Sequence, residues 1–516
     1  MLLVYNDVNP KELEMKHAIH SKPRTHTDKT TPAHGHSRRR HAEMISQHAR
    51  PTAHVSWMVL ALLAVVQFMV ILDVTVVNVA LPSIGSSLGF SLGDLQWVIS
   101  AYVLFTGGLM LLGGRLADLA GRRRIFLIGL GIFTAGSLAS GLATSPTMLI
   151  VTRAIQGVGA ALLLPSGLSI VTTTYEGHQR AVALAVWGAL GAAGAAAGVL
   201  IGGVLTSLLS WHWIFFINVP IGVIVGGLVL HTIAAQPTRF KFSELDLPGA
   251  TALMGGLAAL VLTAQGTADH GWTSAHTVTR GVIATVLLAS FTAIELHTLR
   301  PLVPPAIWRT RSLVAGASVM LAATGLLVGG FFLNTLYLQN VLNASPIETG
   351  LAFLPLTLMI LVGAHAASNH LPKIGTRTPM VAGLVFAAVG SFLLSRAPVD
   401  ASYAADVLPG FIGLGFGIGM TFVAVSVAAM ADVKEAVAGL ASGMMTTAHE
   451  LGAAIGVAVL AAVASAGADG ASQAQIVDGH HDALVVAGVI AIAGAVIAAT
   501  LVPSTRPEPG SGHSMH

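Results

Sequence analysis

The sequence predicts an all-α polytopic membrane protein with 14 transmembrane helices, arranged as two six-helix bundles plus a two-helix insertion. Three observations lead to this prediction. Hydrophobic residues make up 54% of the 516 positions and charged residues only 9%, against roughly 25% charged in an ordinary soluble domain. Apolar runs of about 20 residues, the length a helix needs to cross ~30 Å of hydrocarbon, recur along the chain. The lysines and arginines fall mainly between these runs, in alternate gaps.

Polar breaks divide the apolar sequence into fourteen predicted spans. An even number of spans places both termini on the same side of the membrane. The predicted spans are residues 57–82, 95–113, 125–143, 148–171, 182–208, 213–233, 248–266, 280–298, 313–338, 349–370, 379–396, 406–430, 437–465 and 483–502.

The basic residues test this division, because short cytoplasmic loops carry an excess of Lys and Arg. With the N-terminus inside, all but three of the 26 Lys and Arg residues fall in loops or terminal segments assigned to that side. The exceptions are Arg153 within a span, and Arg280 and Arg396 at outward ends. We therefore expect a multi-pass protein of the plasma membrane with both termini cytoplasmic.

The spans group into two similar halves around a central hairpin. We expect halves of this kind in a transporter with internal repeats. A weak sequence repeat agrees, because "GRRRIFLIGL" (121–130) and "GTRTPMVAGL" (375–384) each lead into the third span of a half. The predicted parts are a basic, His-rich disordered arm (1–54), an N-terminal bundle (55–233), the two-helix insertion with its linkers (234–312), a C-terminal bundle (313–503) and a cytoplasmic tail (504–516).

The composition excludes several kinds of chemistry. The chain has no cysteine, so disulfides and thiolate metal sites are ruled out. It has no glycine loop ending in Gly-Lys-Ser/Thr, so nucleotide hydrolysis by that route is not expected. Its basic residues form no patch with interleaved aromatic residues, so no nucleic-acid partner is expected. We interpret the histidines of the arm as part of a disordered segment and expect no metal site, no cofactor and no enzymatic activity.

Asp73 lies in the middle of the first predicted span, within "MVILDVTVVNVALP" (69–82). A charge at this depth is costly, so intramembrane acids face protein or water and often mark an ion path. Burial also disfavours the charged form of a carboxylate, which suits an acid that loads and releases a proton. The position favours a proton carrier, and the alternative is a structural acid bonded permanently to a neighbouring helix.

Arg153 is the only basic residue deep inside a predicted span. Gln156, Gly157 and Ala160 follow it on one helix face, so this stripe of polar and small residues is expected to face protein. An unpaired guanidinium at this depth would be very costly. We expect Arg153 to pair with Asp73, either conditionally during function or as a fixed ion pair.

Glu450 is the second acid at mid-membrane depth, in the predicted span 437–465. Its neighbour His449 makes a local ion pair possible, which is the alternative to a role in proton coupling. No second histidine follows at the spacing of a zinc-hydrolase helix, so a membrane metalloprotease is not expected.

The loop "GGRLADLAGRRRI" (113–125) joins the second and third predicted spans. We expect Gly114 and Gly121 to allow a tight reversal, Asp118 to cap or pair with a helix end, and Arg122 to anchor the loop at the inner surface. The alternative is a charged turn without further function.

The fifth predicted span carries a glycine face. A face without side chains lets another helix approach closely and slide or bend, although close packing alone is an equal alternative. The glycines of this face fall within an arc of about 120° and are Gly188, Gly191, Gly194, Gly198 and Gly202.

Taken together, the fourteen spans and the strings "LDVTVVNVALP", "GRLADLAGRRR" and "RAIQGVGAALLLP" resemble the 14-span drug:proton antiporters of the major facilitator superfamily. The likeness continues through "WHWIFFINVPIG", "LQNVLNASPIETGLAFLPL" and "GLASGMMTTAHELGAAIGVAV", and covers nearly all of residues 55–503. It implies alternating access between the two six-helix bundles and export of lipophilic small molecules, such as drugs, antibiotics or related metabolites, in exchange for protons. No partner besides substrate, protons and the lipid bilayer is implied, and we expect a functional monomer.

The resemblance also assigns roles to residues. Asp73 and Arg153 match the acid of the first span and the arginine of the fourth, which implies proton coupling, with Glu450 as an additional acid. The set Gly114, Asp118, Gly121 and Arg122 matches the inner gate loop, and the set Gly194, Gly198 and Gly202 lies at the position of the antiport motif.

Three positions depart from the pattern of the family. Leu119 stands where the loop usually has a basic residue, Val199 stands where a proline usually follows the glycine of span five, and His212 replaces an arginine between two aromatic residues. Relatives that handle divalent cations tend to carry an acid in span ten, whereas residues 349–370 contain none. We therefore expect neutral or singly charged lipophilic substrates. The alternatives are a proton-coupled uptake symporter for a small nutrient and a non-transporting membrane receptor.

Overall fold

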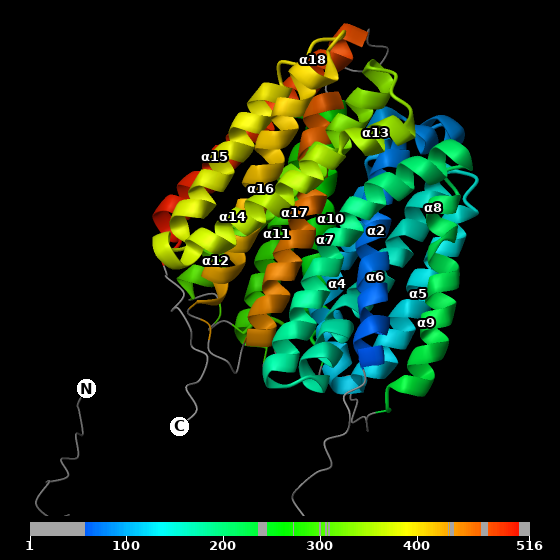
Figure 1. The fold of residues 1–516 in the computed structure, drawn as a ribbon, viewed down its shortest axis with the longest axis vertical. Coiled ribbons are helices and arrows are strands. Elements are labelled where there is room, and N and C mark those ends of the chain that lie inside the picture. The colour runs from blue at the N-terminus through cyan, green and yellow to red at the C-terminus, as the bar shows by residue number, and fades with distance from the viewer. Residues whose placement is uncertain are drawn as a thin grey trace, which may run out of the picture. The chain divides into compact units, whose positions relative to one another are not determined.

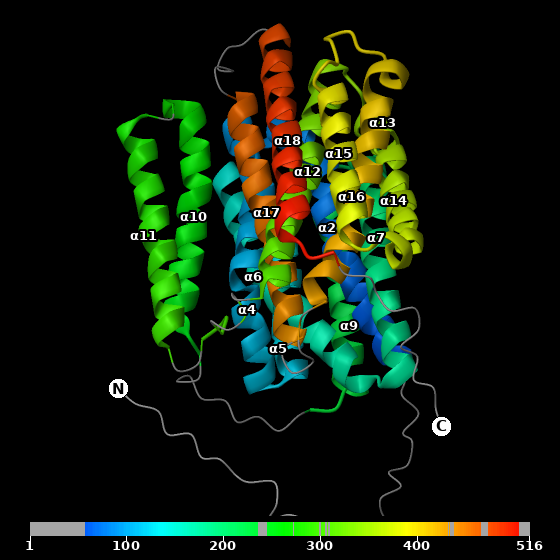
Figure 2. The same ribbon diagram turned by 90° about the vertical axis from the view of Figure 1, so that its left-hand side faces the viewer.

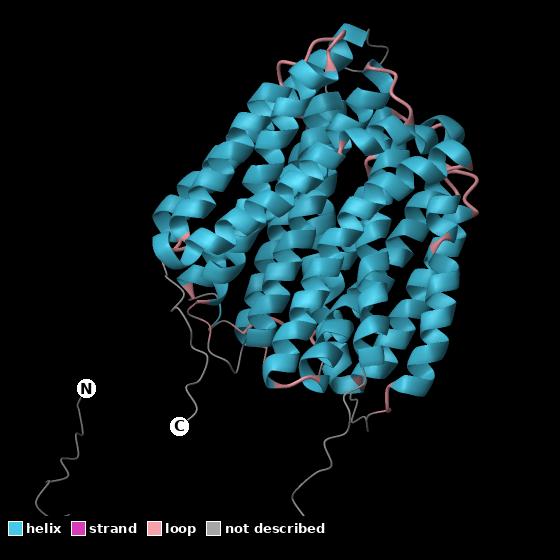
Figure 3. Ribbon diagram, viewed as in Figure 1, coloured by secondary structure: helices cyan, strands magenta, loops and turns pink. Residues whose placement is uncertain are grey.

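The computed structural model describes residues 57–235, 245–271, 273–298, 301–304, 307, 310–431, 433, 438–465 and 473–504. The predicted arm 1–54, parts of the linkers around the central hairpin, and the predicted tail from residue 505 onward lie outside these ranges. Every regular element within them is a helix, and Figure 3 draws no strand in this part of the chain. The predicted all-α class is therefore confirmed.

The helices follow the order of the predicted spans. The first group contains α2 (Trp57–Leu88), α3 (Leu92–Leu95), α4 (Trp97–Ala120), α5 (Arg122–Gly141), α6 (Pro146–Thr174), α7 (Gly177–Leu208), α8 (Trp213–Phe216) and α9 (Asn218–Thr232). A central pair follows, α10 (Leu247–His270) and α11 (Ala275–His297). The last group contains α12 (Arg311–Leu336), the π-helix η4 (Tyr337–Val341), α13 (Pro346–Ala352), α14 (Leu354–Ile374), α15 (Arg377–Leu394), the π-helix η5 (Tyr403–Val407), α16 (Leu408–Met430), α17 (Ala438–Ser465) and α18 (Gln473–Leu501).

Thirteen helices in the described residues are long and apolar enough to cross a membrane. Each coincides with one of the predicted spans. The remaining predicted span, 182–208, falls on α7, whose described apolar segment Ala193–Leu208 is shorter than the other thirteen. The polytopic character is confirmed, whereas the count of fourteen stays a prediction.

Local sequence signals explain where several helices begin and end. Ser145 caps α6 by accepting a hydrogen bond from the Met148 amide, and proline occupies the first helical position. Ser345 and Glu348 form a reciprocal capping box at the start of α13. Gly121 ends α4 with a φ of 91°, a backbone conformation that favours glycine.

The helices pack in two groups, which Figure 1 separates by colour. In the first group α6 packs against both α4 and α5, and α2 packs against α7. In the second group α16 packs against both α14 and α15, and α12 packs against α17. The hairpin of α10 and α11 lies outside, where α10 contacts α4 and α17, as Figure 2 shows at its left edge.

The two groups repeat one local arrangement. Arg123 at the start of α5 donates a hydrogen bond to the Leu230 carbonyl near the end of α9, with an N to O distance of 2.7 Å. Arg377 at the start of α15 donates in the same way to the Val502 carbonyl beyond the end of α18, at 2.9 Å. The two arginines hold the same position in "GRRRIFLIGL" and "GTRTPMVAGL". The weak sequence repeat therefore corresponds to a repeated helix contact.

The groups meet through close helix crossings. A Cβ atom on Gly203 of α7 would lie 2.7 Å from the Pro346 carbonyl oxygen of α13. Near the same end of the helices, Gln339 in η4 donates a hydrogen bond to the Val79 carbonyl of α2, at 2.7 Å. A Cβ atom on Gly107 of α4 would lie 2.7 Å from the Cβ atom of Glu450 in α17. These backbones approach so closely because the glycines carry no side chain.

Candidate functional site

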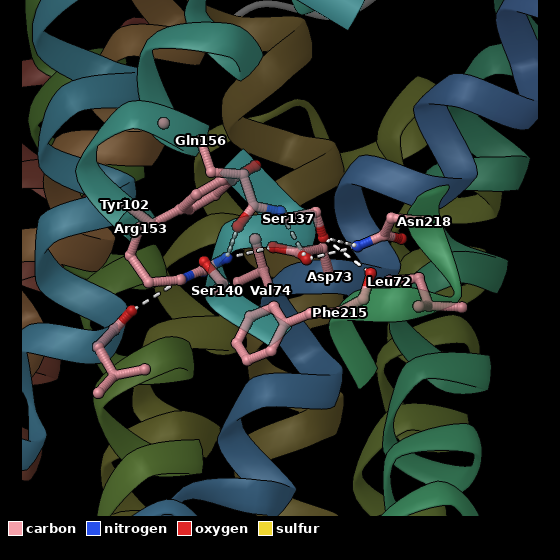
Figure 4. Close-up of polar contacts among 12 residues, drawn as sticks. Leu72, Asp73, Val74, Tyr102, Ser137, Ser140, Arg153, Gln156, Phe215 and Asn218 are labelled. Atoms are coloured by element: carbon pink, nitrogen blue, oxygen red, sulfur yellow. Dashed lines mark hydrogen bonds and ion pairs between the residues drawn. The ribbon is translucent and has the colours of Figure 1, made fainter. Parts of the chain in front are cut away.

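Asp73 lies in α2 with 0% of its surface exposed. Its carboxylate accepts three hydrogen bonds, which come from three side chains on two other helices, as Figure 4 shows. Arg153 Nη1 donates to Oδ2 at 2.5 Å. Gln156 Nε2 and Asn218 Nδ2 both donate to Oδ1, at 2.9 Å and 2.8 Å. The predicted pairing of Asp73 with Arg153 is therefore present in this conformation.

Arg153 in α6 is held from several directions and is 1% exposed. Its Nη1 also donates to the Gln156 side-chain oxygen at 2.8 Å, and its Nε donates to the Val98 carbonyl of α4 at 3.0 Å. The guanidinium carbon lies 4.2 Å from the centre of the Tyr102 ring, in the range of a cation–π interaction. A buried guanidinium with a counter-charge, hydrogen-bond acceptors and an aromatic face satisfies the requirements for a stable buried cation.

Three residues of this cluster carried no predicted role. Asn218, at the first position of α9, contacts both Asp73 and the Ser137 hydroxyl of α5, the latter at 3.0 Å. Ser137 in turn donates to the Phe215 carbonyl at 2.9 Å. Tyr102 of α4 covers the guanidinium. The available signal was an asparagine inside "WHWIFFINVPIG", an apolar segment where an amide needs a partner.

The reversal between α4 and α5 uses one glycine, whereas the sequence predicted two. Gly121 alone makes the turn between Ala120 and Arg122, with its φ of 91°. The prediction that Gly114 helps the chain reverse is wrong, because Gly114 lies inside α4, and a Cβ atom there would contact Pro165 of α6 at an ordinary 3.6 Å.

The pair predicted for Asp118 is present. Its Oδ1 lies 3.7 Å from an Arg122 guanidinium nitrogen. The Asp118 side chain is 56% exposed, so the pair is expected to contribute little to stability.

The glycine face of α7 packs directly on the helix that carries Asp73. A Cβ atom on Gly194 would lie 3.0 Å from the Phe68 carbonyl oxygen, and one on Gly202 would lie 3.0 Å from the Val76 Cα atom. Between them, a Cβ atom on Gly198 would overlap the Thr75 hydroxyl. The glycines therefore remove side chains from the α7 surface opposite the segment of α2 around Asp73.

Comparison with known proteins places this geometry in a family. Residues 63–457 match the family model described as Major Facilitator Superfamily. The chain belongs to the major facilitator superfamily. It is 39% identical over 457 residues to the puromycin resistance protein pur8 of Streptomyces alboniger, covering 86% of this chain and 90% of that protein. It is 37% identical over 454 residues to the cephamycin export protein CmcT of Amycolatopsis lactamdurans, covering 87% and 93%.

Two solved transporter structures share the fold. An auto-inhibited peptide transporter of the POT family aligns with a TM-score of 0.63 at 16% identity, covering 88% of this chain and 98% of that one. The nucleoside transporter NupG aligns with a TM-score of 0.59 at 14% identity, covering 86% and 99%. Together with the family match, these findings make the chain a multi-pass membrane transporter rather than an enzyme.

Glu450 lies on α17, close to Tyr102 of the Asp73 cluster. It is 7% exposed in α17, and its Oε1 lies 3.5 Å from His449 Nδ1, which is the local pair that the sequence allowed. Its backbone crosses α4 at Gly107. Gly107 follows Tyr102 by five residues, or about 7.5 Å of helix. Glu450 thus faces the helix that carries the aromatic partner of Arg153.

The acid nearest to the predicted tenth span, 349–370, is Glu348, which lies just before its first residue and not in the middle of the membrane. Glu348 is exposed in the first turn of α13, where it completes the capping box with Ser345. Within the described ranges, no group of three His, Cys, Asp or Glu side chains is arranged to hold a metal ion. The histidines of the predicted arm lie outside those ranges.

Proposed function

We propose that this protein exports lipophilic small molecules, such as drugs, antibiotics or related metabolites, in exchange for protons by alternating access. The observation that carries the proposal is the buried pair of Asp73 and Arg153, 2.5 Å apart. Burying two charges costs desolvation free energy, which brings no benefit to a passive scaffold. In an ion-coupled transporter such charges can carry the coupling ion. Relatives named for puromycin resistance and cephamycin export support the outward direction of transport.

In the proposed cycle, Asp73 carries the proton. The ion pair with Arg153 controls whether the Asp73 carboxylate can bind that proton. The carboxylate accepts two hydrogen bonds at Oδ1 and one, from Arg153, at Oδ2. A proton that binds Oδ2 removes the negative charge that holds the Arg153 guanidinium. Uptake of a proton and release of Arg153 then become one event. The released guanidinium keeps the Val98 carbonyl and the Tyr102 ring as neighbours, which lowers the cost of separating the pair.

The proposed membrane orientation places both termini in the cytoplasm of a plasma-membrane protein. Residues 55–233 and 313–503 then form the two moving bundles, and residues 234–312 form an insertion beside them. In this orientation the crossing of Gly203 with α13 and the bond from Gln339 to α2 lie on the outer side. Contacts on that side support an outward-closed state. Toward the inner side, Leu111 of α4 also packs against α17 near Gly443.

The inner gate loop and the glycine face are proposed to support this movement. The exposed contact of Asp118 with Arg122 lies at the α4–α5 turn, where it can break at little cost. The Gly194, Gly198 and Gly202 face lets α7 shift along α2 without a side-chain clash. Glu450 is proposed as a second, auxiliary proton site, and the protein is proposed to act as a monomer.

One proton suffices for the proposed task. Moving one charge through 100 mV supplies ~2.3 kcal/mol, and a tenfold gradient costs about 1.4 kcal/mol. At about 150 mV, one proton could therefore hold a neutral compound near a few-hundredfold gradient. This gradient is large enough to protect a cell from a toxin.

The deciding experiment measures proton release from acidified inverted membrane vesicles after addition of puromycin and a panel of lipophilic compounds. The wild type is expected to release protons with at least one compound, whereas Asp73→Asn is expected to release none. Unchanged coupling in Asp73→Asn would refute the assignment of the proton carrier. Accumulation of a nutrient by intact cells, without tolerance to toxins, would instead indicate the uptake symporter.

The proposed substrate class is neutral or singly charged. It rests on the predicted span 349–370, which contains no acidic residue. The neighbouring acid Glu348 is exposed at the start of α13 and engaged in the capping box. The purified protein in proteoliposomes is expected to transport a monocationic dye and not a dicationic one. Robust export of the dication would contradict this proposal.

A further inference from the structure

A cavity opens between the start of α5 and the end of α9. It is open to the surface and has a volume of about 750 Å³. Its wall includes Gly121, Arg123, Arg124, Leu127, Ile128 and Leu230. The cavity therefore combines two arginines with apolar side chains, and the proposed transport cycle uses neither arginine.

The two arginines supply positive charge to the cavity. Within the described ranges, neither Arg123 nor Arg124 forms an ion pair, whereas their neighbour Arg122 pairs with Asp118. Arg123 is fixed across the cavity by its bond to the Leu230 carbonyl at 2.7 Å. This bond uses one of the five N–H donors of a guanidinium. The cavity thus offers a positioned cation at one end and a second, exposed cation beside it.

The apolar wall leads from these charges onto the membrane-facing surface. Ile128 of α5 is 42% exposed and Leu230 of α9 is 54% exposed. Farther along α9, Val223, Ile224 and Leu228 are also exposed. These side chains belong to helices long enough to span the membrane, so their exposed face is a lipid-facing one. A ligand that matches both parts needs an anionic head and an apolar tail.

We propose that this cavity binds an anionic phospholipid from the leaflet that holds the α4–α5 turn, with its phosphate at Arg123 and Arg124 and its acyl chains along α5 and α9. Basic pockets between transmembrane helices are favourable places for such head groups. Arginine suits a phosphate because its planar donors can bind two oxygens at once. A soluble anion would use the arginines but would leave the apolar wall without a partner.

The second half of the protein provides an internal contrast. Arg377 makes the same bond to a carbonyl of its own group, but Thr378 stands at the position that corresponds to Arg124. The sequence repeat therefore keeps the helix contact in both halves and the pair of cations in only one. This difference makes Arg377 a matched control, because its replacement removes an equivalent bond without touching the cavity.

Native mass spectrometry of the full-length protein in detergent tests the site directly. The protein is titrated with dioleoylphosphatidylglycerol, with dioleoylphosphatidylcholine and with glycerol phosphate. Phosphatidylglycerol is expected to bind best, with affinity about 5-fold lower in Arg124→Gln and about 30-fold lower in Arg123→Gln/Arg124→Gln. Arg377→Gln is expected to stay within about 2-fold of the wild type, because it is remote from the cavity.

Several outcomes would overturn the proposal. Equal binding of phosphatidylglycerol and phosphatidylcholine would remove the role of charge, and glycerol phosphate binding as tightly as the lipid would remove the role of the tail. Arg124→Gln decides the matter if the double variant does not fold, because it leaves the Arg123–Leu230 bond in place. In a second measurement, phosphatidylglycerol with a photoreactive acyl chain is expected to label peptides of α5 and α9. Labelling confined to other helices would refute the site.

Discussion

Replacing Asp73 by asparagine is expected to destabilise the protein, because it leaves the Arg153 guanidinium buried without a counter-charge. Removing one partner of a buried ion pair costs about 3–5 kcal/mol. Arg153 is 1% exposed, so water cannot replace the carboxylate without rearrangement. The guanidinium still keeps the Val98 carbonyl, the Gln156 side-chain oxygen and the Tyr102 ring. These neighbours place the expected loss at the lower end of the range, about 3 kcal/mol.

A second substitution separates the effect of charge from that of packing. Asp73→Asn/Arg153→Gln removes both charges, so it is expected to regain about 2 kcal/mol relative to Asp73→Asn. The free energies of unfolding of the wild type, both single variants and the double variant are measured by denaturant titration in one detergent. The reasoning is refuted if the double variant is no more stable than Asp73→Asn. Proton release from vesicles should be absent in Asp73→Asn and in Asp73→Asn/Arg153→Gln, because both lack the carboxylate that carries the proton.

Four further predictions concern other positions. Gly198→Val is expected to lower the free energy of unfolding by about 1–3 kcal/mol, because the new side chain overlaps α2. It is also expected to slow substrate transport in vesicles. Gly227→Ala, where a Cβ atom meets no atom within 4 Å, should do neither. Asp118→Asn should cost less than about 1 kcal/mol, because the pair is exposed, yet change the rate of transport; unchanged flux would remove its gate role. Glu450→Gln should reduce proton release without abolishing it, and complete loss would make this acid essential. Burial lowers the pKa of His212, so stability is expected to fall as the pH drops below about 6.5, where the unfolded chain gains the proton more readily than the folded chain. Thermal unfolding of His212→Asn between pH 8 and pH 5 should show a smaller fall, and an identical curve would contradict it.

The spans were predictable because they depend on local properties. Length, apolar composition and the positions of Lys and Arg do not require knowledge of which helices touch. Helix boundaries are also predictable where a capping or turn residue marks them, as Ser145 marks the start of α6 and Gly121 the end of α4. Gly114 shows the limit of this approach. Glycine at this position suggested a turn. In the structure α4 continues through Gly114, and Pro165 of α6 packs beside it.

The site was predictable only in part, because its contacts cross between helices. The expense of two buried opposite charges was enough to pair Asp73 with Arg153. The same reasoning does not tell which helix supplies the next donor. Asn218 reaches the carboxylate from α9, 145 positions away in the sequence, through a crossing that no local pattern encodes. Polar side chains in apolar segments were therefore visible as candidates, while their partners were not.

The two crossings of α7 have a consequence for repeated cycling. This helix meets α2 through Gly198 and Gly202, and it meets α13 through Gly203, on a different side. At each crossing, α7 presents bare backbone, which has no rotamers to fix. Ordinary side chains lose rotamer freedom of up to ~2 kcal/mol each whenever a contact re-forms. A helix with bare surfaces toward α2 and α13 can separate from them and close again without that entropic penalty on its own side of these two contacts.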